Sequence, residues 1–370
     1  MILWYGWLAI LLAACGEAGG GETAVPTINH QLLAVSRQPL AVSRQPLAVS
    51  PEPLAGTPSP PHSLTPSPPH LVTLSPTPFS TPNPYTAYTI ESLAARAYGG
   101  GVLEIVDTLE ETETFSRYLI TYPSDGLTIY GFMNVPHEGD NFPVAIVLHG
   151  YVDPADYETV AYTRRYADAL AEAGYFVIHP NFRNYPPSDE GPNAYRVGYA
   201  VDVLNLIAVI REQSQDPIGT LRRADADRIH LWGHSMGGGV ALRVITVNNE
   251  PYIRAAVLYA AMSGDEQQNF EQIQMWTNGR SGDFELNAPP EMLAAISPIN
   301  YLDRITASIS IHHSAADDVV PVAWSNDLCQ RLQAINHPVE CHTYFAVPHT
   351  FRGQNDEIFM ERVVRFFDSN

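Results

Sequence analysis

Three residues at Gly-x-Ser-x-Gly spacing, Gly233, Ser235 and Gly237, could present a nucleophilic serine. A short apolar run from Ile229 to Trp232 precedes them and predicts a buried strand, and a helix is predicted from Met236 to Val247. A serine on so sharp a strand-to-helix turn needs a strained backbone, and side chains two residues to either side would clash with the turn. The turn would hold the hydroxyl clear of the sheet, at a helix N-terminus that favours developing negative charge. The alternative interpretation is a Gly-rich turn with an incidental serine.

A serine hydroxyl is a poor nucleophile at neutral pH, so it needs a general base that an acid holds in one tautomer. His349 is predicted to be the base, because it follows a predicted strand and precedes the last predicted helix. His342 is the rival, but it falls inside the strand pattern and would point sideways from the sheet. Asp317 and Asp318 both follow another predicted strand and are the candidate acids.

The oxyanion that forms on attack needs two donors, which are usually backbone amides. We expect one from Met236, directly after the nucleophile, and one from Tyr151, after the His149-Gly150 pair that ends an apolar run. The side chains of Tyr151, Tyr185 and Trp276 are predicted to line the substrate pocket. For His234 we expect a packing role. The sequence contains no His-Glu-x-x-His motif and no Gly-rich phosphate loop with a lysine, so we predict no metal and no cofactor.

Apolar strand patterns alternate with helical patterns along the chain, which predicts right-handed crossovers and a mostly parallel sheet. Strands are expected at 115–122, 127–135, 143–148, 175–179, 225–232, 253–260, 308–312 and 339–347, and helices at 157–173, 196–213, 236–247, 321–335 and 356–367. Residues 262–301 break this alternation and are predicted to be a lid insertion. The candidate serine, acid and base each come just past a predicted strand, where ligands of such sheets bind.

The composition bounds the class of protein. The chain has 370 residues, enough for a large single-domain core, and a formal net charge of −20. No basic stripe is present to neutralise phosphates, so nucleic acid is not an expected partner.

The N-terminus is predicted to be a targeting signal. Residues 1–15 form a short apolar stretch that ends Leu-Ala-Ala-Cys and resembles a bacterial lipoprotein signal, in which Cys15 is lipidated. Residues 16–88 contain Pro-rich repeats and are predicted to be a disordered spacer. We therefore expect an exported protein at the bacterial cell surface or in the periplasm, with a lipid anchor in the membrane. An ordinary secretory signal or an uncleaved anchor remains the alternative. In such a compartment Cys329 and Cys341 could form a disulfide.

Residues 121–367 resemble the α/β-hydrolase superfamily, and most closely the prolyl-oligopeptidase-type catalytic domains and the dienelactone-hydrolase and acyl-esterase group. The resemblance rests on five short motifs, namely His149-Gly150-Tyr151, Gly233 to Gly238, Ser297-Pro298, Asp317 to Pro321 and Pro348-His349. It implies an α/β-hydrolase fold over residues 89–370, with a mostly parallel central sheet, helices on both faces and a lid. It also favours Asp317 as the acid, because many members carry His-Gly-x-x-Asp-x-x-Val-Pro, although Ser314 stands here in place of the glycine.

The expected function is that of a serine hydrolase that cleaves a carboxylic ester through Ser235, His349 and Asp317 and an acyl-enzyme. Prolyl oligopeptidases carry a large β-propeller before the catalytic domain. Only a spacer and a hairpin are predicted there in this sequence, which favours an ester over a short peptide as substrate. A serine peptidase or acyl-amide hydrolase is the first alternative, and a non-catalytic surface binding protein that keeps the fold is the second.

Overall fold

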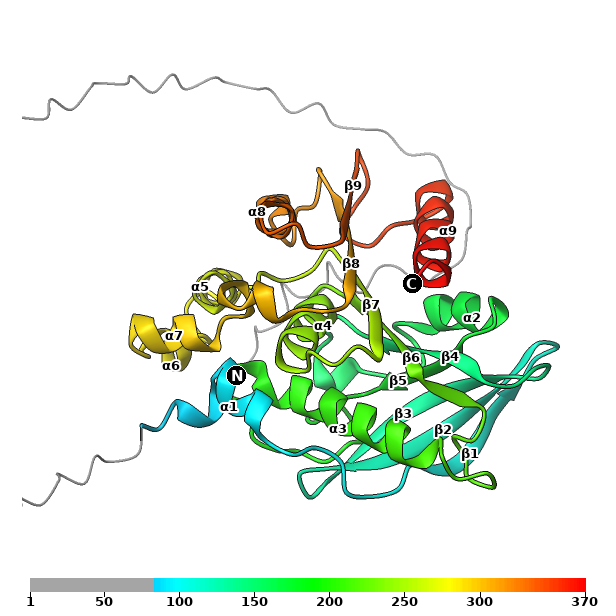
Figure 1. The fold of residues 1–370 in the computed structure, drawn as a ribbon. Coiled ribbons are helices and arrows are strands. Elements are labelled where there is room, and N and C mark those ends of the chain that lie inside the picture. Colours follow the sequence, from blue (N-terminus) through cyan, green and yellow to red (C-terminus); the bar gives the residue numbers. More distant parts are fainter. Residues whose placement is uncertain (1–82) are drawn as a thin grey trace, which may run out of the picture. The chain divides into compact units, whose positions relative to one another are not determined.

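The computed structural model describes residues 83–370 (Figure 1). The predicted signal, Cys15 and the spacer up to residue 82 lie outside the described residues. Tyr85 and Tyr88, which the sequence assigned to the end of the spacer, contact the ring of Tyr195 at centroid distances of 6.2 and 5.3 Å. The ordered contacts of the domain therefore begin a few residues before Thr89.

A nine-stranded sheet runs through the domain in the order β1-β2-β3-β5-β4-β6-β7-β8-β9. The first three strands and the β3–β5 pair are antiparallel, and all pairs from β5 to β9 are parallel. The strands are β1 (Glu104–Glu111), β2 (Phe115–Ser124), β3 (Leu127–Pro136), β4 (Phe142–Leu148), β5 (Phe176–Pro180), β6 (Ala224–His234), β7 (Ile253–Tyr259), β8 (Ser308–Ser314) and β9 (Val339–Tyr344).

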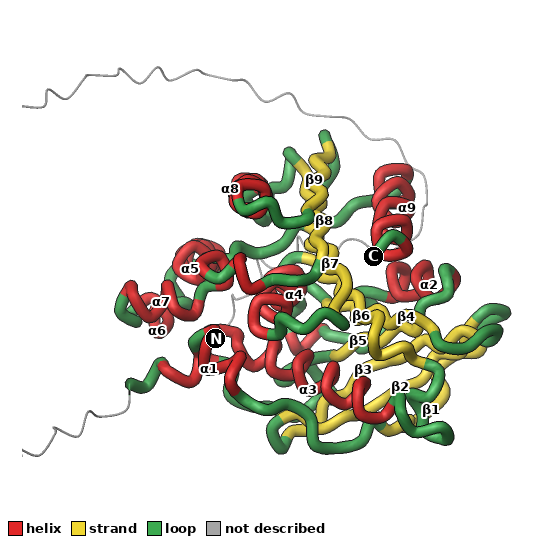
Figure 2. The backbone as a smooth tube through the Cα atoms, viewed as in Figure 1, coloured by secondary structure: helices red, strands yellow, loops and turns green. Residues whose placement is uncertain are grey.

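The central parallel strands are apolar on both faces because helices cover both faces of the sheet (Figure 2), whereas β9 at the edge is mostly exposed. In β4, Val144 and Ile146 join the hydrophobic cluster on one side, and Ala145 and Val147 join the cluster on the other. This alternation is the two-residue period of a strand, and it explains why 143–148 reads as one uninterrupted apolar run.

The helices divide between the two faces. Leu170 of α2 and Phe359 of α9 belong to one cluster, and Leu204 of α3, Leu242 of α4 and Leu332 of α8 belong to the other. Figure 1 shows α2 and α9 together on one side of the sheet, with α3 and α4 on the opposite side. The helices are α1 (Ile90–Ala95), α2 (Arg164–Glu172), α3 (Val197–Gln213), α4 (Met236–Val247), α5 (Glu266–Trp276), α6 (Asp283–Leu286), α7 (Pro290–Ile296), α8 (Val322–Ala334) and α9 (Gln354–Asp368).

The predicted fold class is confirmed, and all eight predicted strands exist with their bounds shifted by a few residues. The prediction for the helix over 157–173 is wrong in its first half, because α2 begins only at Arg164. Tyr157, Tyr162 and Thr163 instead direct their hydroxyls to buried histidines. These tertiary hydrogen bonds hold the stretch before Arg164 in turns.

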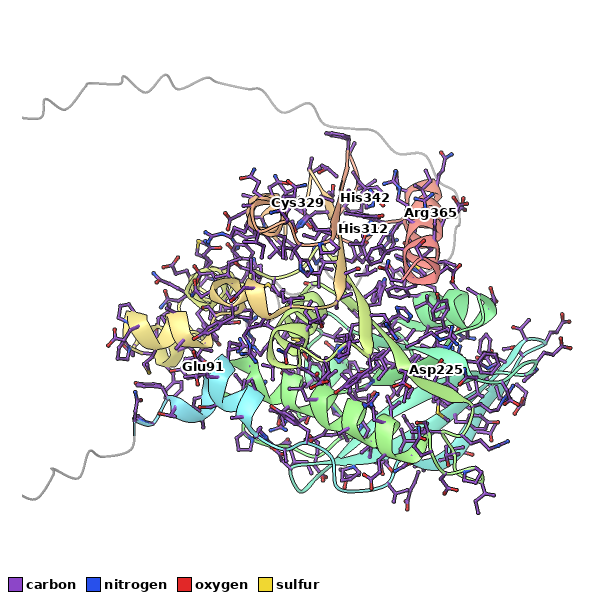
Figure 3. All side chains as sticks on the ribbon, viewed as in Figure 1. Glu91, Asp225, His312, Cys329, His342 and Arg365 are labelled. Carbon is purple, nitrogen blue, oxygen red and sulfur yellow. A yellow bond between two sulfur atoms is a disulfide. The ribbon has the colours of Figure 1, made fainter. Side chains whose placement is uncertain are left out.

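The insertion at 262–301 contains α5, α6 and α7, between β7 and β8. A disulfide joins Cys329 of α8 to Cys341 of β9, as the sequence analysis considered (Figure 3 labels Cys329). Over residues 83–370, no helix is both long enough and apolar enough to cross a membrane.

Candidate active site

The backbone at Ser235 has the strained conformation that the sequence predicts. β6 ends at His234 and α4 begins at Met236, and between them Ser235 has φ 55° and ψ −116°. A Cβ on Gly237 would lie 2.6 Å from the carbonyl oxygen of His149 and closer still to that of Leu148. The start of α4 therefore packs directly on the end of β4, and only glycine permits this approach.

His349 and Asp317 form a hydrogen-bonded pair beside this strand-to-helix turn at Ser235, which we call the elbow. His349 Nδ1 lies 2.7 Å from Asp317 Oδ2, and the Asp317 side chain is fully buried. Because the carboxylate accepts the proton on Nδ1, Nε2 of a neutral His349 keeps its lone pair. That nitrogen is the one that could accept a proton from a serine.

The carboxylate of Asp317 is surrounded by donors. The backbone amides of Val319 and Val320 each donate to Oδ1 at 2.9 Å, and His313 Nε2 lies 3.1 Å from Oδ2. Burial alone would raise the pKa of Asp317, but the hydrogen bonds from His313 and His349 hold that pKa well below its ordinary value. The acid therefore stays ionised across the physiological range.

His313 is a residue that the sequence analysis used only as a spacing marker. Its Nε2 faces both Asp317 and the carbonyl oxygen of Val320, at 3.1 Å in each case, so this nitrogen carries the proton. Its Nδ1 lies 2.7 Å from the Ser325 hydroxyl of α8, which donates to it. The position of His313, four residues before Asp317, was the available signal.

The rival residues lie elsewhere. Asp318 is exposed to solvent. His342 stands on β9, where its Nε2 is 3.2 Å from Glu340 and its ring stacks on His312 at 4.7 Å, as Figure 3 shows for the two labelled histidines. The geometry therefore joins Asp317, and not Asp318, to His349.

The base lies next to the nucleophile's own segment. The ring of His349 is 4.6 Å from the ring of His234, the residue before Ser235. Ser235 and His349 are 9% and 6% exposed, so both lie at the floor of the site.

The loop after β4 reaches the serine from the other side. A Cβ on Gly150 would lie 3.2 Å from Cβ of Ser235, so the backbone of this loop passes directly beside the nucleophile. The amide of Tyr151 follows at once, and its side chain is 54% exposed. Met236 supplies the first amide of α4. Both predicted oxyanion donors thus belong to segments that border Ser235.

Two of the predicted pocket residues, Tyr185 and Trp276, lie in different surroundings. Tyr185 is fully buried beneath the loop after β4, with its hydroxyl 3.9 Å from Met236 Sδ and its ring 4.6 Å from that of His149. Trp276 ends α5 and is 42% exposed. Among residues 83–370, no described hydrogen bond or ring contact joins Trp276 to the serine, acid or base.

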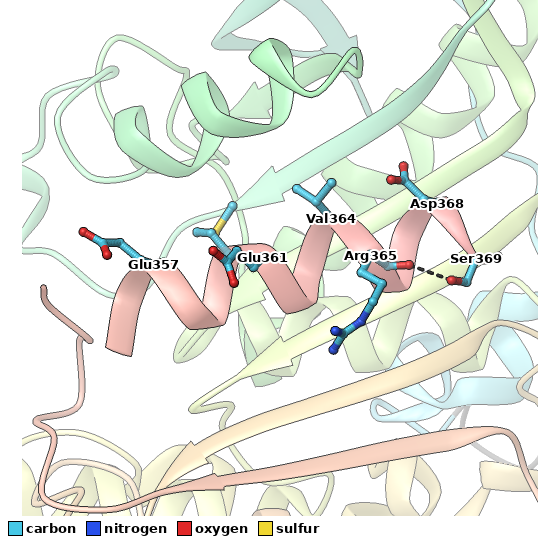
Figure 4. A pocket seen from close by; sticks show the side chains of 7 residues that line it. Glu357, Glu361, Val364, Arg365, Asp368 and Ser369 are labelled. Carbon is cyan, nitrogen blue, oxygen red and sulfur yellow. Dashed lines mark hydrogen bonds between the residues drawn. The ribbon is translucent and has the colours of Figure 1, made fainter. Parts of the chain in front are cut away.

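Away from this site, a shallow surface depression of about 530 Å³ runs along α9 (Figure 4). One helix and the residue after it supply its lining, which includes Glu357, Glu361 and Asp368 but none of the candidate catalytic residues. Within the described part of the chain, no group of His, Cys, Asp and Glu side chains could hold a metal ion.

The model of the prolyl oligopeptidase family matches residues 213–370, which include Ser235, Asp317 and His349. Over 254 residues the chain is 22% identical to the uncharacterized peptidase YtmA of Bacillus subtilis. The aligned region covers 67% of this chain and 90% of YtmA. Acetyl xylan esterase 1 from Thermoanaerobacterium superposes with a TM-score of 0.56 at 15% identity, over 76% of this chain and 92% of the esterase. The chain therefore has the fold of these hydrolases.

The chain spans only part of some larger proteins that it resembles. A puromycin-hydrolyzing peptidase of Mycobacterium tuberculosis superposes with a TM-score of 0.56 at 20% identity, over 70% of this chain but only 40% of the peptidase. The family match, the esterase and peptidase likenesses and the geometry at Ser235 together support a serine hydrolase.

Proposed function

We propose that this chain is a serine carboxylesterase that acts through an acyl-enzyme. The observation that carries the proposal is the 2.7 Å hydrogen bond between His349 Nδ1 and the buried, ionised Asp317, beside a strained serine. A buried carboxylate in this position fixes the tautomer of the base and stabilises the imidazolium that forms when the base takes a proton.

In the proposed mechanism Ser235 Oγ attacks the acyl carbonyl carbon while His349 Nε2 takes the hydroxyl proton. The amides of Met236 and Tyr151 stabilise the oxyanion. His349 then gives its proton to the leaving alcohol, and the acyl-enzyme forms. Water attacks the acyl-enzyme with His349 as base, and the carboxylic acid leaves as Ser235 regains its proton. The exposed side chain of Tyr151, which follows Gly150 beside Ser235, would border the acyl or alcohol group.

An ester is preferred over a peptide because the likeness to the acetyl xylan esterase extends over nearly all of that enzyme, whereas the likeness to the puromycin-hydrolyzing peptidase extends over two fifths of it. The second candidate is a serine peptidase acting on short peptides or acyl amides. The match to the prolyl oligopeptidase family favours it. The match to YtmA, which is named an uncharacterized peptidase, extends over 90% of that protein and supports the second candidate.

A panel of p-nitrophenyl esters, from acetate to palmitate, tested beside aminoacyl-p-nitroanilides would decide between the two. The full chain and its Ser235→Ala variant should be compared. We expect ester turnover that disappears in the variant. Turnover of anilides alone would make the chain a peptidase. Failure of a fluorophosphonate probe to label the wild type would instead favour a non-catalytic binding protein.

We further propose that the protein is exported and anchored to the membrane by lipid on Cys15. The Cys329–Cys341 disulfide supports export, because such bonds persist mainly in oxidising compartments. We expect the wild-type protein to partition with membranes and a Cys15→Ser variant to be released. A variant that stays in the membrane fraction would contradict the lipid anchor.

A further inference from the structure

Tyr162 and His234 connect the loop before the oxyanion donor to the loop of the base. The Tyr162 hydroxyl lies 2.7 Å from His234 Nδ1, and His234 Nε2 lies 3.2 Å from the backbone carbonyl oxygen of His349. The backbone of Gly150 also packs directly on the Tyr162 hydroxyl. A Cβ at Gly150 would fall 2.9 Å from Cζ of this tyrosine and closer still to its oxygen.

The direction of each hydrogen bond follows from the chemistry of the partners. The carbonyl oxygen of His349 can only accept, so the proton of His234 resides on Nε2. His234 is fully buried, and burial lowers its pKa well below the usual value, so the ring is neutral. Its Nδ1 therefore has a lone pair and accepts the hydroxyl proton of Tyr162.

These contacts join segments that the sheet alone does not fix relative to one another. Gly150 lies in the loop after β4 and directly precedes the proposed donor Tyr151. His349 lies in the loop after β9, the last strand in the parallel part of the sheet, several strands away from β4. His234 is the last residue of β6, between them, and its ring also packs on Tyr259 at 4.2 Å.

We propose that Tyr162 and His234 are positioning residues for the hydrolase reaction. They hold the loop after β9, which carries His349, and the loop after β4, which carries Tyr151, in place around Ser235. Neither touches the reacting atoms. Their effect is on the alignment of His349 and Tyr151, and misalignment of catalytic groups lowers the rate of the chemical step more than it lowers substrate binding. The inference rests on the proposed serine hydrolase function.

The test compares Tyr162→Phe with Tyr175→Phe in the full chain. Tyr175 is a buried tyrosine whose hydroxyl donates to Asp368 of α9, 2.6 Å away, so its variant loses the same kind of hydrogen bond outside the site. We expect Tyr162→Phe to lower kcat for p-nitrophenyl acetate about tenfold, with KM within about twofold, and Tyr175→Phe to leave kcat unchanged. Equal kcat values in the two variants would overturn the proposal.

His234 provides an independent variant if Tyr162→Phe does not fold. His234→Gln keeps an amide donor for the carbonyl of His349, whereas His234→Phe keeps none. We expect the glutamine variant to retain at least about ten times the kcat of the phenylalanine variant. Equal losses would mean that His234 only fills space.

The rate at which a fluorophosphonate labels Ser235 separates this inference from the proposed function. If the wild type hydrolyses no ester, the esterase proposal fails, but the labelling rate still depends on the alignment of His349 with Ser235. Tyr162→Phe should then be labelled about tenfold more slowly than Tyr175→Phe. Equal labelling rates would refute the positioning role.

Discussion

Gly237→Ala tests whether the elbow needs glycine so that α4 can pack closely against the end of β4. The added methyl would lie 2.6 Å from the carbonyl oxygen of His149 and closer still to that of Leu148. Backbone atoms cannot rotate away, so α4 and the end of β4 must separate by about 1 Å to reach a normal contact distance. Overpacking of this kind costs about 1–3 kcal/mol of stability.

The same displacement should reduce catalysis. The amide of Met236 moves with α4, and the amide of Tyr151 moves with the loop after β4. A misplacement of about 1 Å between catalytic groups lowers a rate by about 100-fold. We therefore expect kcat for p-nitrophenyl acetate to fall about 100-fold in Gly237→Ala, with a lower Tm by thermal unfolding.

Gly239→Ala is the matched control on the same helix. Its added methyl would lie 3.1 Å from Cβ of Met262, a contact that a shift of a few tenths of an ångström relieves, and the next nearest atoms lie at 3.9 Å. Alanine also favours a helix over glycine by about 1 kcal/mol. This control should keep its kcat and Tm. A Gly237→Ala protein with the kcat and Tm of the control would refute the argument that the elbow needs glycine for close approach.

Three further outcomes are expected. Asp317→Asn should lower kcat about 10⁴-fold with little change in KM, because an amide cannot hold His349 in the required tautomer; a loss below tenfold would return the role of acid to Asp318. Burial lowers the pKa of His230 to about 3, so the unfolded chain binds the proton first as pH falls, and stability that is complete above about pH 6.5 should decline toward pH 3. Urea unfolding at several pH values should show a shallower decline in His230→Gln, and identical slopes would contradict the shift. Reduction of the Cys329–Cys341 bond, which spans 12 residues, should cost about 3 kcal/mol in thermal or urea unfolding. Cys341→Ser should be insensitive to the reductant, and a wild type that is equally insensitive would be inconsistent with a stabilising disulfide.

Elements with a strong periodic or continuous apolar pattern could be predicted from the sequence. The run at 143–148 and the helix from Met236 to Val247 have interior positions on one or both faces, so burial determines their residue types. β1 was not predicted, because Glu104–Glu111 is an edge strand that is almost wholly exposed and carries acidic residues. An exposed edge places little constraint on sequence, so it leaves no pattern to read.

The site shows the same division between local and distant contacts. Ser235 could be identified because the elbow restricts residues within two positions of it, and the turn geometry is local. The contact between Tyr162 and His234 joins residues 72 apart in sequence, and no local pattern reports it. The sequence therefore predicted a candidate serine, acid and base, whereas the hydrogen bonds of Tyr162 and His234 could be found only in the three-dimensional structure.

The buried histidines around the site differ from His349 in the partners that their ring nitrogens bond. At the carboxyl ends of parallel strands, backbone carbonyls lack partners in the sheet and must find donors elsewhere. His179 Nδ1 lies 3.0 Å from the carbonyl oxygen of Val147, and His234 Nε2 bonds that of His349. Burial lowers the pKa of both rings well below the usual value, so each can satisfy a carbonyl as a neutral donor. His349 differs from both rings, because its Nδ1 pairs with the carboxylate of Asp317 instead of a backbone carbonyl, and this is the arrangement that its proposed role as base requires.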